Sequence, residues 1–486
     1  MTSTSTESQA SGAPVSASAT DDRLTARARL TLLLLCAAQF IIALDFSILS
    51  VALPVLGEDL GMGQADLQWA MTAFALPSGG FLLLFGRISD LFGRRLLFLA
   101  GLAAFTLASV LAAAAWDPAS FLTARALQGL GAAAVVPTGM SLLTTTFPEG
   151  PQRNKALAVN GTVLSLGFTV GILLGGMMTD QLGWRSTMAM LAGAGAIVAL
   201  VAPALLAESR PAERPRLDVP GAVTVTGGLL SVIYALSTAA DQGFGEVEVI
   251  VALVLGLLLL AAFVAVEFRA AQPLVSLQML RRPGVAFGNL GGLTTFSMMS
   301  SVIFLLTLYL QQVLGLSGFE TSLVFGAQGV VLAVTGMVAS RIVAAIGARA
   351  TLVTGLAVQA AGTAALVFLP ARGGVPLAVT ALLLASVGHM SAVVSYGINA
   401  TSGLTDHEQG LATGLVTSAQ QIGITVGIPV LSALAAGRAS ALERTGEDVA
   451  AALRAGTRLG LGVDAALVMA AALAIAVGLR RARAAR

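Results

Sequence analysis

Long apolar runs, separated by short clusters of charged residues, proline and glycine, repeat along almost all of this 486-residue chain. Most runs reach about 20 residues, the length that an α-helix needs to cross the hydrocarbon core of a bilayer. The pattern predicts fourteen transmembrane helices, over residues 30–53, 67–86, 95–115, 119–146, 156–179, 185–206, 219–239, 247–267, 285–313, 320–340, 350–369, 375–402, 409–435 and 460–479. The expected fold class is therefore an all-α polytopic membrane protein.

The composition supports this interpretation. Hydrophobic residues make up 56% of the chain and charged residues 11%, whereas a soluble domain carries about a quarter charged residues. Because so much of the chain is hydrophobic, membrane lipid is an expected partner. The charges of the 27 basic and 25 acidic residues nearly cancel, so nucleic acid is not expected as a partner. The single cysteine, Cys36, excludes a disulfide framework and a multi-cysteine metal site, and we expect no metal.

The positions of Lys and Arg predict the orientation. An even number of helices places both termini on one side; with that side cytoplasmic, the inner segments hold twenty basic residues and the outer segments six. This bias agrees with the positive-inside rule. Four of the six outer residues fall in the amphipathic segment 436–458, which we expect to lie as a helix on the outer surface.

An internal repeat predicts the domain organisation. Segment 86–95 matches segment 340–349 at two Arg, one Ile and one Gly, as expected for two six-helix bundles related by a parallel repeat, a transporter architecture with its substrate path between the bundles. We expect a disordered cytoplasmic tail, a first bundle, an inserted pair of lipid-facing helices with basic linkers, a second bundle and a basic cytoplasmic tail, over residues 1–29, 30–206, 207–284, 285–480 and 481–486.

Four motifs resemble those of a known family. Segment 86–95 resembles the loop motif between helices 2 and 3 of the major facilitator superfamily. Segments 44–54, 125–131 and 167–176 resemble the motifs of helices 1, 4 and 5 in its 14-helix drug:proton antiporter family. The match departs from the family where Ile172 replaces the usual Pro of helix 5, and where Ser47 and Ser50 replace the usual Thr and Asn of helix 1.

The resemblance implies a monomeric exporter in the cytoplasmic membrane of a bacterium. Such a protein moves small lipophilic drugs or natural products by alternating access, and it needs protons and a proton gradient but no cofactor. The sequence contains no phosphate-binding loop, zinc-protease motif or nucleophile elbow, so no enzyme is predicted. Two alternatives remain open, a proton-coupled uptake symporter for a small organic solute and a membrane sensor that transports nothing.

Two charged residues lie inside predicted helices, where their transfer from water is costly. Asp45 can hold either a proton or a cationic group, which makes it the candidate coupling site; alternatively it is hydrated near the outer end, or paired permanently with Arg125. The resemblance assigns the matching Arg to proton coupling, and a structural anchor is the alternative for Arg125. Glu320, Asp180 and Glu267 fall at helix ends, so we expect Asp45 to be the single mid-helix acid.

Segment 86–95 is interpreted as a cytoplasmic latch between the bundles, with positive-inside anchoring as the alternative. Its candidate residues are Gly86, Asp90, Gly93, Arg94 and Arg95.

The glycines of helix 5 form a stripe without side chains that allows close helix packing. The resemblance adds a sliding, proton-impermeable seam as a second role. The residues are Gly167, Gly171, Gly175 and Gly176, and pairs at 410/414 and 423/427 are expected to pack alike.

Polar, soft and aromatic side chains of other helices are candidates for the substrate path. They are Gln128, His389, Gln420, Gln421, Met298 and Tyr396.

Overall fold

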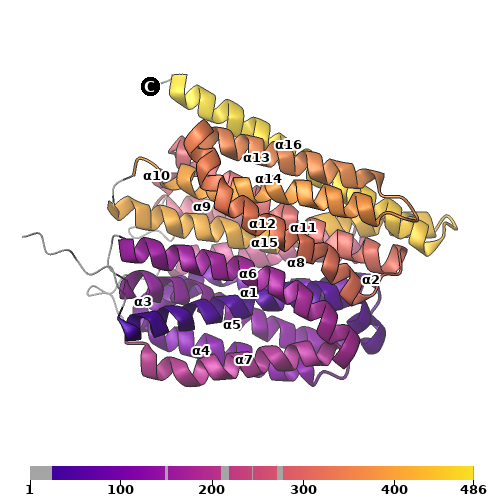
Figure 1. The fold of residues 1–486 in the computed structure, drawn as a ribbon, viewed down its shortest axis with the longest axis horizontal. Coiled ribbons are helices and arrows are strands. Elements are labelled where there is room, and N and C mark those ends of the chain that lie inside the picture. The colour runs from indigo at the N-terminus through magenta and orange to yellow at the C-terminus, as the bar shows by residue number, and fades with distance from the viewer. Residues whose placement is uncertain are drawn as a thin grey trace, which may run out of the picture.

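The computed structural model describes residues 25–147, 151–208, 218–243, 245–270, 277–404 and 406–484, and these contain helices and no strand. The first part of the chain forms seven helices packed side by side (Figure 1). They are α1 (Ala26–Leu60), α2 (Gln64–Gly80), α3 (Leu82–Phe92), α4 (Arg94–Ala113), α5 (Pro118–Thr146), α6 (Pro151–Leu182) and α7 (Trp184–Leu205). We call this set the N-terminal bundle.

The helices that follow begin with the pair α8 (Val219–Gln242) and α9 (Val247–Glu267). Next come α10 (Leu277–Leu280), α11 (Pro283–Leu308), the π-helical turn η1 (Tyr309–Val313), α12 (Gly318–Ile346), α13 (Ala348–Ala365), the 3-10 turn η2 (Leu366–Phe368), α14 (Val375–Thr401), α15 (Asp406–Glu443) and α16 (Val449–Ala484). We call α11–α16 the C-terminal bundle. The end of the molecule where α1 ends is called the distal end.

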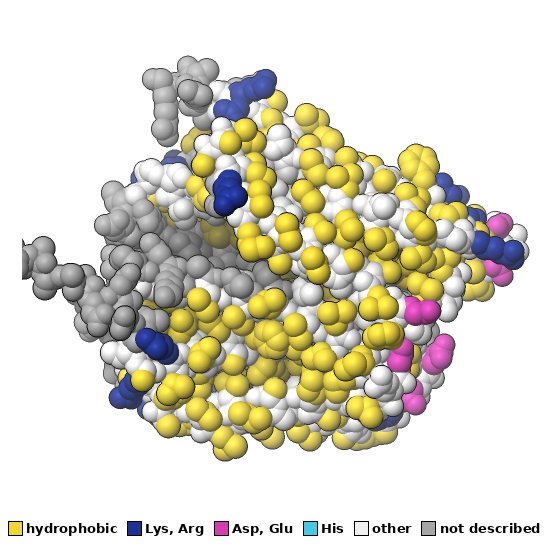
Figure 2. Space-filling model, in the orientation of Figure 1, with side chains coloured by type: hydrophobic (Ala, Val, Ile, Leu, Met, Phe, Trp, Pro, Cys, Tyr) yellow, Lys and Arg dark blue, Asp and Glu magenta, His cyan; other side chains and the backbone are white. Residues whose placement is uncertain are grey.

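Among the described residues, thirteen helices are long and apolar enough to span a membrane. The bent pair α2 and α3 counts as a fourteenth span. Apolar side chains cover the midsection of the face in Figure 2, and charged side chains gather at its two ends. The chain is therefore a multi-pass membrane protein, and the predicted fold class is confirmed.

Several predicted bounds need correction. Residues 67–86 were expected to form one helix, but the chain bends by 42° between α2 and α3. Pro77 lies one turn before the bend and Gly80 ends α2; proline and glycine are common causes of kinks because proline lacks an N–H group.

The helix ends also differ from expectation. α1 begins at Ala26, inside the predicted tail, because the hydroxyl of Thr25 accepts the Ala28 N–H. The prediction of a surface helix over residues 436–458 is wrong: α15 continues to Glu443 and α16 begins at Val449. α16 itself continues to Ala484, into the predicted basic tail.

The two loops of the sequence repeat have matching geometry. Gly93 joins α3 to α4 with φ +113°, and Gly347 joins α12 to α13 with φ +84°. Arg95 then donates to the Pro203 carbonyl at the end of α7, 2.8 Å away. Arg349 donates to the carbonyls of Leu479 and Ala476 in α16, at 3.2 and 2.9 Å. Each loop thus braces the last helix of its own bundle.

The two inserted helices, both expected to face lipid, differ in how they pack. α9 packs against α8 and leaves most of its apolar side chains exposed. α8 instead packs between α2 and α15, where Trp69 and Tyr234 bring their rings to 6.0 Å. α8 therefore contacts both bundles.

Candidate functional site

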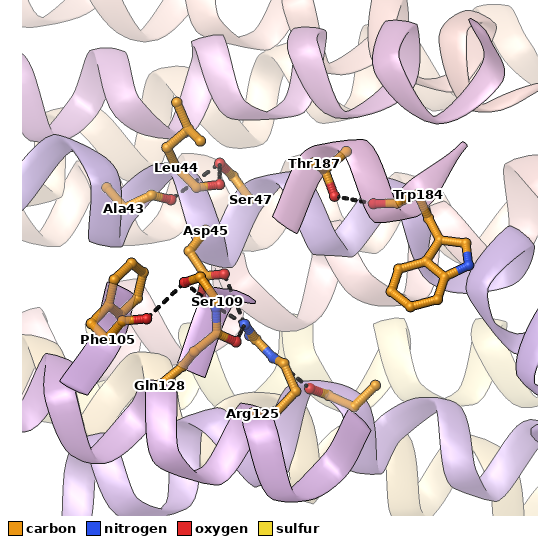
Figure 3. A network of polar contacts seen from close by, with 11 residues as sticks. Ala43, Leu44, Asp45, Ser47, Phe105, Ser109, Arg125, Gln128, Trp184 and Thr187 are labelled. Carbon is orange, nitrogen blue, oxygen red and sulfur yellow. Dashed lines mark hydrogen bonds and ion pairs between the residues drawn. The ribbon is translucent and has the colours of Figure 1, made fainter. Parts of the chain in front are cut away.

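Asp45 and Arg125 meet inside the N-terminal bundle, although 80 residues separate them in the sequence. Arg125 Nη1 lies 2.8 Å from each carboxylate oxygen of Asp45, and both side chains are 0% exposed (Figure 3). A guanidinium group carries a fixed positive charge. A buried charge of this kind needs a counter-ion, and the Asp45 carboxylate provides it.

Further groups complete the network around Arg125. Its Nη1 donates to Gln128 Oε1 at 2.8 Å, and its Nε donates to the Ala70 carbonyl at 3.2 Å. Gln128 in turn donates to the Ser109 hydroxyl at 2.8 Å (Figure 3). The Phe74 ring covers the guanidinium with its centre 4.6 Å from Cζ, a favourable arrangement for a cation. The structure thus places Gln128 in this network.

One guanidinium nitrogen remains without a protein partner. Arg125 Nη2 is buried and makes no hydrogen bond. A missing partner for a buried donor costs about 1–3 kcal/mol. The hydrogen-bonding groups of this network are therefore all paired except Arg125 Nη2.

The sequence of α5 positions Arg125 toward α1 and α2. Asp117 accepts the Ser120 N–H at 2.7 Å and caps the helix, and Pro118 fits its first turn. One turn after Arg125, a Cβ at Gly129 would overlap the Phe74 carbonyl oxygen. Glycine at that position lets α2 approach closely enough for Ala70 and Phe74 to reach the guanidinium.

The glycine stripe of α6 packs against the part of α1 that holds Asp45. A Cβ at Gly167 would lie 3.0 Å from Ala43 Cβ, and one at Gly175 would lie 2.8 Å from the Ile48 carbonyl oxygen. A Cβ at Gly171 would overlap Ser47 Oγ. Close packing of this stripe is confirmed.

The fourth glycine of the motif lies elsewhere. A Cβ at Gly176 would overlap the Gly318 carbonyl oxygen of α12, so this residue joins the two bundles. In α15, Gly423 and Gly427 pack tightly on α11, but a Cβ at Gly414 would meet nothing within 4 Å. The expected packing of Gly414 is therefore wrong.

A second polar cluster brings together three predicted path residues in the C-terminal bundle. His389 Nδ1 lies 2.9 Å from Thr295 Oγ1, and Thr295 Oγ1 donates to Gln359 Oε1 at 2.6 Å. Because the Thr295 hydroxyl has one proton and gives it to Gln359, His389 Nδ1 is the donor to Thr295.

Phe296 connects this cluster to the other two residues. Its ring meets the rings of His389 and Tyr396 edge to face, at 5.3 and 6.1 Å. The Tyr396 hydroxyl donates to Gln420 Oε1 at 3.3 Å. His389, Tyr396 and Gln420 thus come together, whereas Met298 is buried in α11, and the Gln421 side chain lies outside the described part of the structure.

The described contacts of the predicted latch stay inside the N-terminal bundle. Arg95 N–H donates to Glu208 Oε1 at 3.3 Å, and a Cβ at Gly93 would lie 2.7 Å from the same oxygen. A Cβ at Gly86 would make an ordinary contact with Pro137 at 3.8 Å. The side chain of Asp90, the residue expected to bridge the bundles, lies outside the described part, so the latch stays a prediction.

The two bundles are joined at the distal end by hydrogen bonds. Gln311 Nε2 of η1 donates to the Val51 carbonyl of α1 at 3.0 Å. The Phe319 N–H of α12 donates to Asp180 Oδ2 of α6 at 2.8 Å. A cavity of about 810 Å³ opens beside these contacts, and its lining includes the acids Glu58, Asp180 and Asp448.

The expectation that Asp45 is the single mid-helix acid is wrong. Asp464 lies in the membrane-spanning part of α16 and is 0% exposed. Its signal is present in the sequence, because residue 464 falls inside the apolar run 460–479.

Comparisons with known proteins agree with this architecture. The model of the Major Facilitator Superfamily matches residues 35–428. The chain is 38% identical to the cephamycin export protein CmcT of Amycolatopsis lactamdurans, with 84% of this chain and 85% of the relative covered. It is 37% identical to the puromycin resistance protein of Streptomyces alboniger, with 84% and 82% covered.

A solved structure extends the likeness to the fold. The transporter PepTSo of the POT family matches with a TM-score of 0.72 and 14% identity, over 93% of this chain and 98% of that one. The family model covers most of the chain. Both relatives are more than 30% identical to it over more than four-fifths of its length. The chain belongs to the major facilitator superfamily.

Proposed function

We propose that this protein exports antibiotics or other lipophilic natural products across the bacterial cytoplasmic membrane in exchange for protons. The observation that carries the proposal is the buried pair of Asp45 on α1 and Arg125 on α5. The substrate class is supported by the relatives, one of which exports cephamycin and another of which confers puromycin resistance. In this proposal the protein acts as a monomer with both termini in the cytoplasm, and it catalyses no reaction.

Proton binding at Asp45 changes what holds α1 to α5. A protonated Asp45 is neutral, so the Arg125 charge loses its counter-ion in a site without water-exposed atoms. The arrangement with Asp45 protonated therefore favours a conformation in which Arg125 meets water or another acceptor. Loss of the proton restores the pair. Protonation is in this way coupled to the packing of α1, and through Gly171 and Gly175 to α6.

Alternating access also needs contacts that close one end of the protein, and the hydrogen bonds at the distal end have this role in the proposal. Asp180 and Gln311 join the bundles at the end that the distribution of Lys and Arg predicts to be outside. These contacts must break before a substrate leaves on that side. The cluster of His389, Tyr396 and Gln420 offers aromatic faces and hydrogen-bonding groups to a substrate between the bundles, and segment 86–95 acts as the latch at the opposite end.

Asp45→Asn is the direct test. The amide keeps the size of the side chain but cannot exchange a proton, so a pump-deficient host that carries this variant should lose resistance to puromycin when it is compared with the wild type at equal membrane protein levels. Glu447→Gln is the matched control, because Glu447 is exposed in the turn after α15. Wild-type resistance in Asp45→Asn would contradict the coupling role of Asp45, and a wild-type protein that confers no resistance would favour the sensor that transports nothing.

The uptake symporter is separated by the direction of transport. In proteoliposomes with an imposed proton gradient, an antiporter moves puromycin against the proton flow. Accumulation of puromycin along with the protons would contradict the proposal.

A further inference from the structure

Asp464 on α16 has no hydrogen-bonding partner among the described residues. Both carboxyl oxygens are buried and neither makes a hydrogen bond. The face of α16 that carries it points into the C-terminal bundle, because Thr457, Leu461 and Val468, at helical spacing from Asp464, are also 0% exposed. The carboxyl group therefore lies in the core of the bundle and not on its lipid surface.

Neighbouring charged groups do not neutralise it. The titratable or charged side chains described on the elements that pack against α16 are Tyr309 of η1, Arg349 of α13, and Arg438 and Glu443 of α15. The Tyr309 hydroxyl donates to the Pro370 carbonyl at 2.7 Å, and Arg349 donates to carbonyls twelve or more residues further along α16. Arg438 and Glu443 are exposed at the distal end of α15.

The basic residues of α16 nearest in sequence, Arg454 and Arg458, make no hydrogen bond to Asp464. Arg458 donates to the Val367 carbonyl. Arg458 and Arg454 lie six and ten residues before Asp464, which along an α-helix is about 9 and 15 Å.

An ionised carboxylate in this position would be strongly unfavourable, because no hydrogen bond or opposite charge among the described residues offsets its loss of water. The neutral acid avoids most of that cost. Asp45 differs in the same conformation, because the Arg125 guanidinium lies 2.8 Å from its carboxylate and provides an opposite charge. One buried carboxyl thus has a counter-charge beside it, and the other has none.

We propose that Asp464 is a second proton-binding site, which carries a proton in this conformation and contributes one proton to the transport cycle. The proposal rests on the proposed proton-coupled export. A carboxyl group inside a membrane helix costs stability, and here it makes no hydrogen bond with the described residues in return. Proton binding is a role that needs no fixed partner.

The protonation state is tested first, without transport. Infrared spectra of the full-length protein in liposomes at neutral pH should contain a carboxylic acid C=O band that Asp464→Asn removes and Glu447→Gln leaves unchanged. A hydrophobic carbodiimide, which reacts with protonated carboxyls, should modify Asp464 in the wild type, as peptide mapping can detect. This second measurement needs no variant and so does not depend on whether Asp464→Asn folds. An unmodified Asp464 together with an unchanged band would overturn the proposal.

The role in the cycle is tested by stoichiometry. The proton-to-puromycin ratio, measured from the gradient that just balances transport in proteoliposomes, should fall by one proton in Asp464→Asn. An unchanged ratio would overturn the role in the cycle. Failure of the proposed export is recognised separately, because the wild-type protein would then confer no puromycin resistance and move no puromycin in proteoliposomes, while the infrared and labelling results would stay intact.

Discussion

At the scale of single residues, variants of the buried ion pair can distinguish its contribution to folding stability from its contribution to proton coupling. Removal of one partner leaves the other charge buried and uncompensated, which costs about 3–5 kcal/mol. Asp45 and Arg125 are both 0% exposed and 2.8 Å apart, so each is expected to depend on the other. If the pair is only a structural anchor, removal of both charges should restore stability and export together. If the pair couples protons, removal of both charges should restore stability alone.

We expect Arg125→Gln to lower the thermal stability of the purified protein and to abolish puromycin export. The double variant Asp45→Asn with Arg125→Gln should recover much of the stability, because no charge remains buried, and should still fail to export. Thermal unfolding and proteoliposome transport of the four proteins measure both effects. Export by the double variant would assign the pair a purely structural role.

The sequence predicted which two charged residues of the N-terminal bundle lie inside the membrane, where a charge is unfavourable. It did not predict how their side chains are arranged. Asp45 and Arg125 stand out because each lies inside an apolar run. Their pairing could not be decided, since a contact across 80 residues depends on how α1 and α5 pack. The bond from Gln128 to Ser109 was missed for the same reason. Asp464, by contrast, was visible in the sequence and was overlooked.

At the scale of elements, the glycine stripe of α6 determines how close α1 lies. Gly171 has no room for a Cβ next to Ser47 of α1, whereas a Cβ at Gly161 on the same helix would meet nothing within 4 Å. The two glycines have similar helical propensity costs, so they form a matched pair. A difference in export between alanine variants at these two positions therefore reports the effect of helix packing.

Gly171→Ala should therefore displace α1 at the turn that carries Asp45 and reduce export strongly. Gly161→Ala should leave export close to that of the wild type. Puromycin efflux from cells with equal membrane levels of the two variants is the measurement. Equal export by both would argue against a functional seam between α1 and α6.

Helix positions were predicted more reliably than helix ends. Apolar runs locate the part of a helix inside the bilayer, and all fourteen predicted runs overlap helices of the structure. The join of α15 to α16 was misjudged because its basic residues, among them Arg438 and Arg454, were interpreted as a surface segment. Both helices in fact extend past the apolar core, where polar residues continue a helix without cost.

At the scale of the whole molecule, the two bundles must separate at the distal end for a substrate to leave there. Asp180 of α6 and Phe319 of α12 are joined by a hydrogen bond of 2.8 Å. A covalent link at this position should hold that end closed.

We expect a short thiol crosslinker to stop export by the variant Asp180→Cys with Phe319→Cys in a Cys36→Ser background. A cleavable crosslinker should allow export to recover on reduction, as proteoliposome transport can show. Variants with one of the two cysteines should be insensitive to the reagent. Continued export by fully crosslinked protein would contradict alternating access through the distal end.

The brace formed by Arg95 has a consequence for biogenesis. Its partner, the carbonyl of Pro203, is synthesised 108 residues later, at the end of α7. By the time Pro203 has been made, α1–α6 are complete and none of α11–α16 has been made. Arg349 repeats the arrangement, because its acceptors lie in the last helix of the chain. Each half can therefore close on itself once its own final helix is inserted, because its brace needs no residue of the other half.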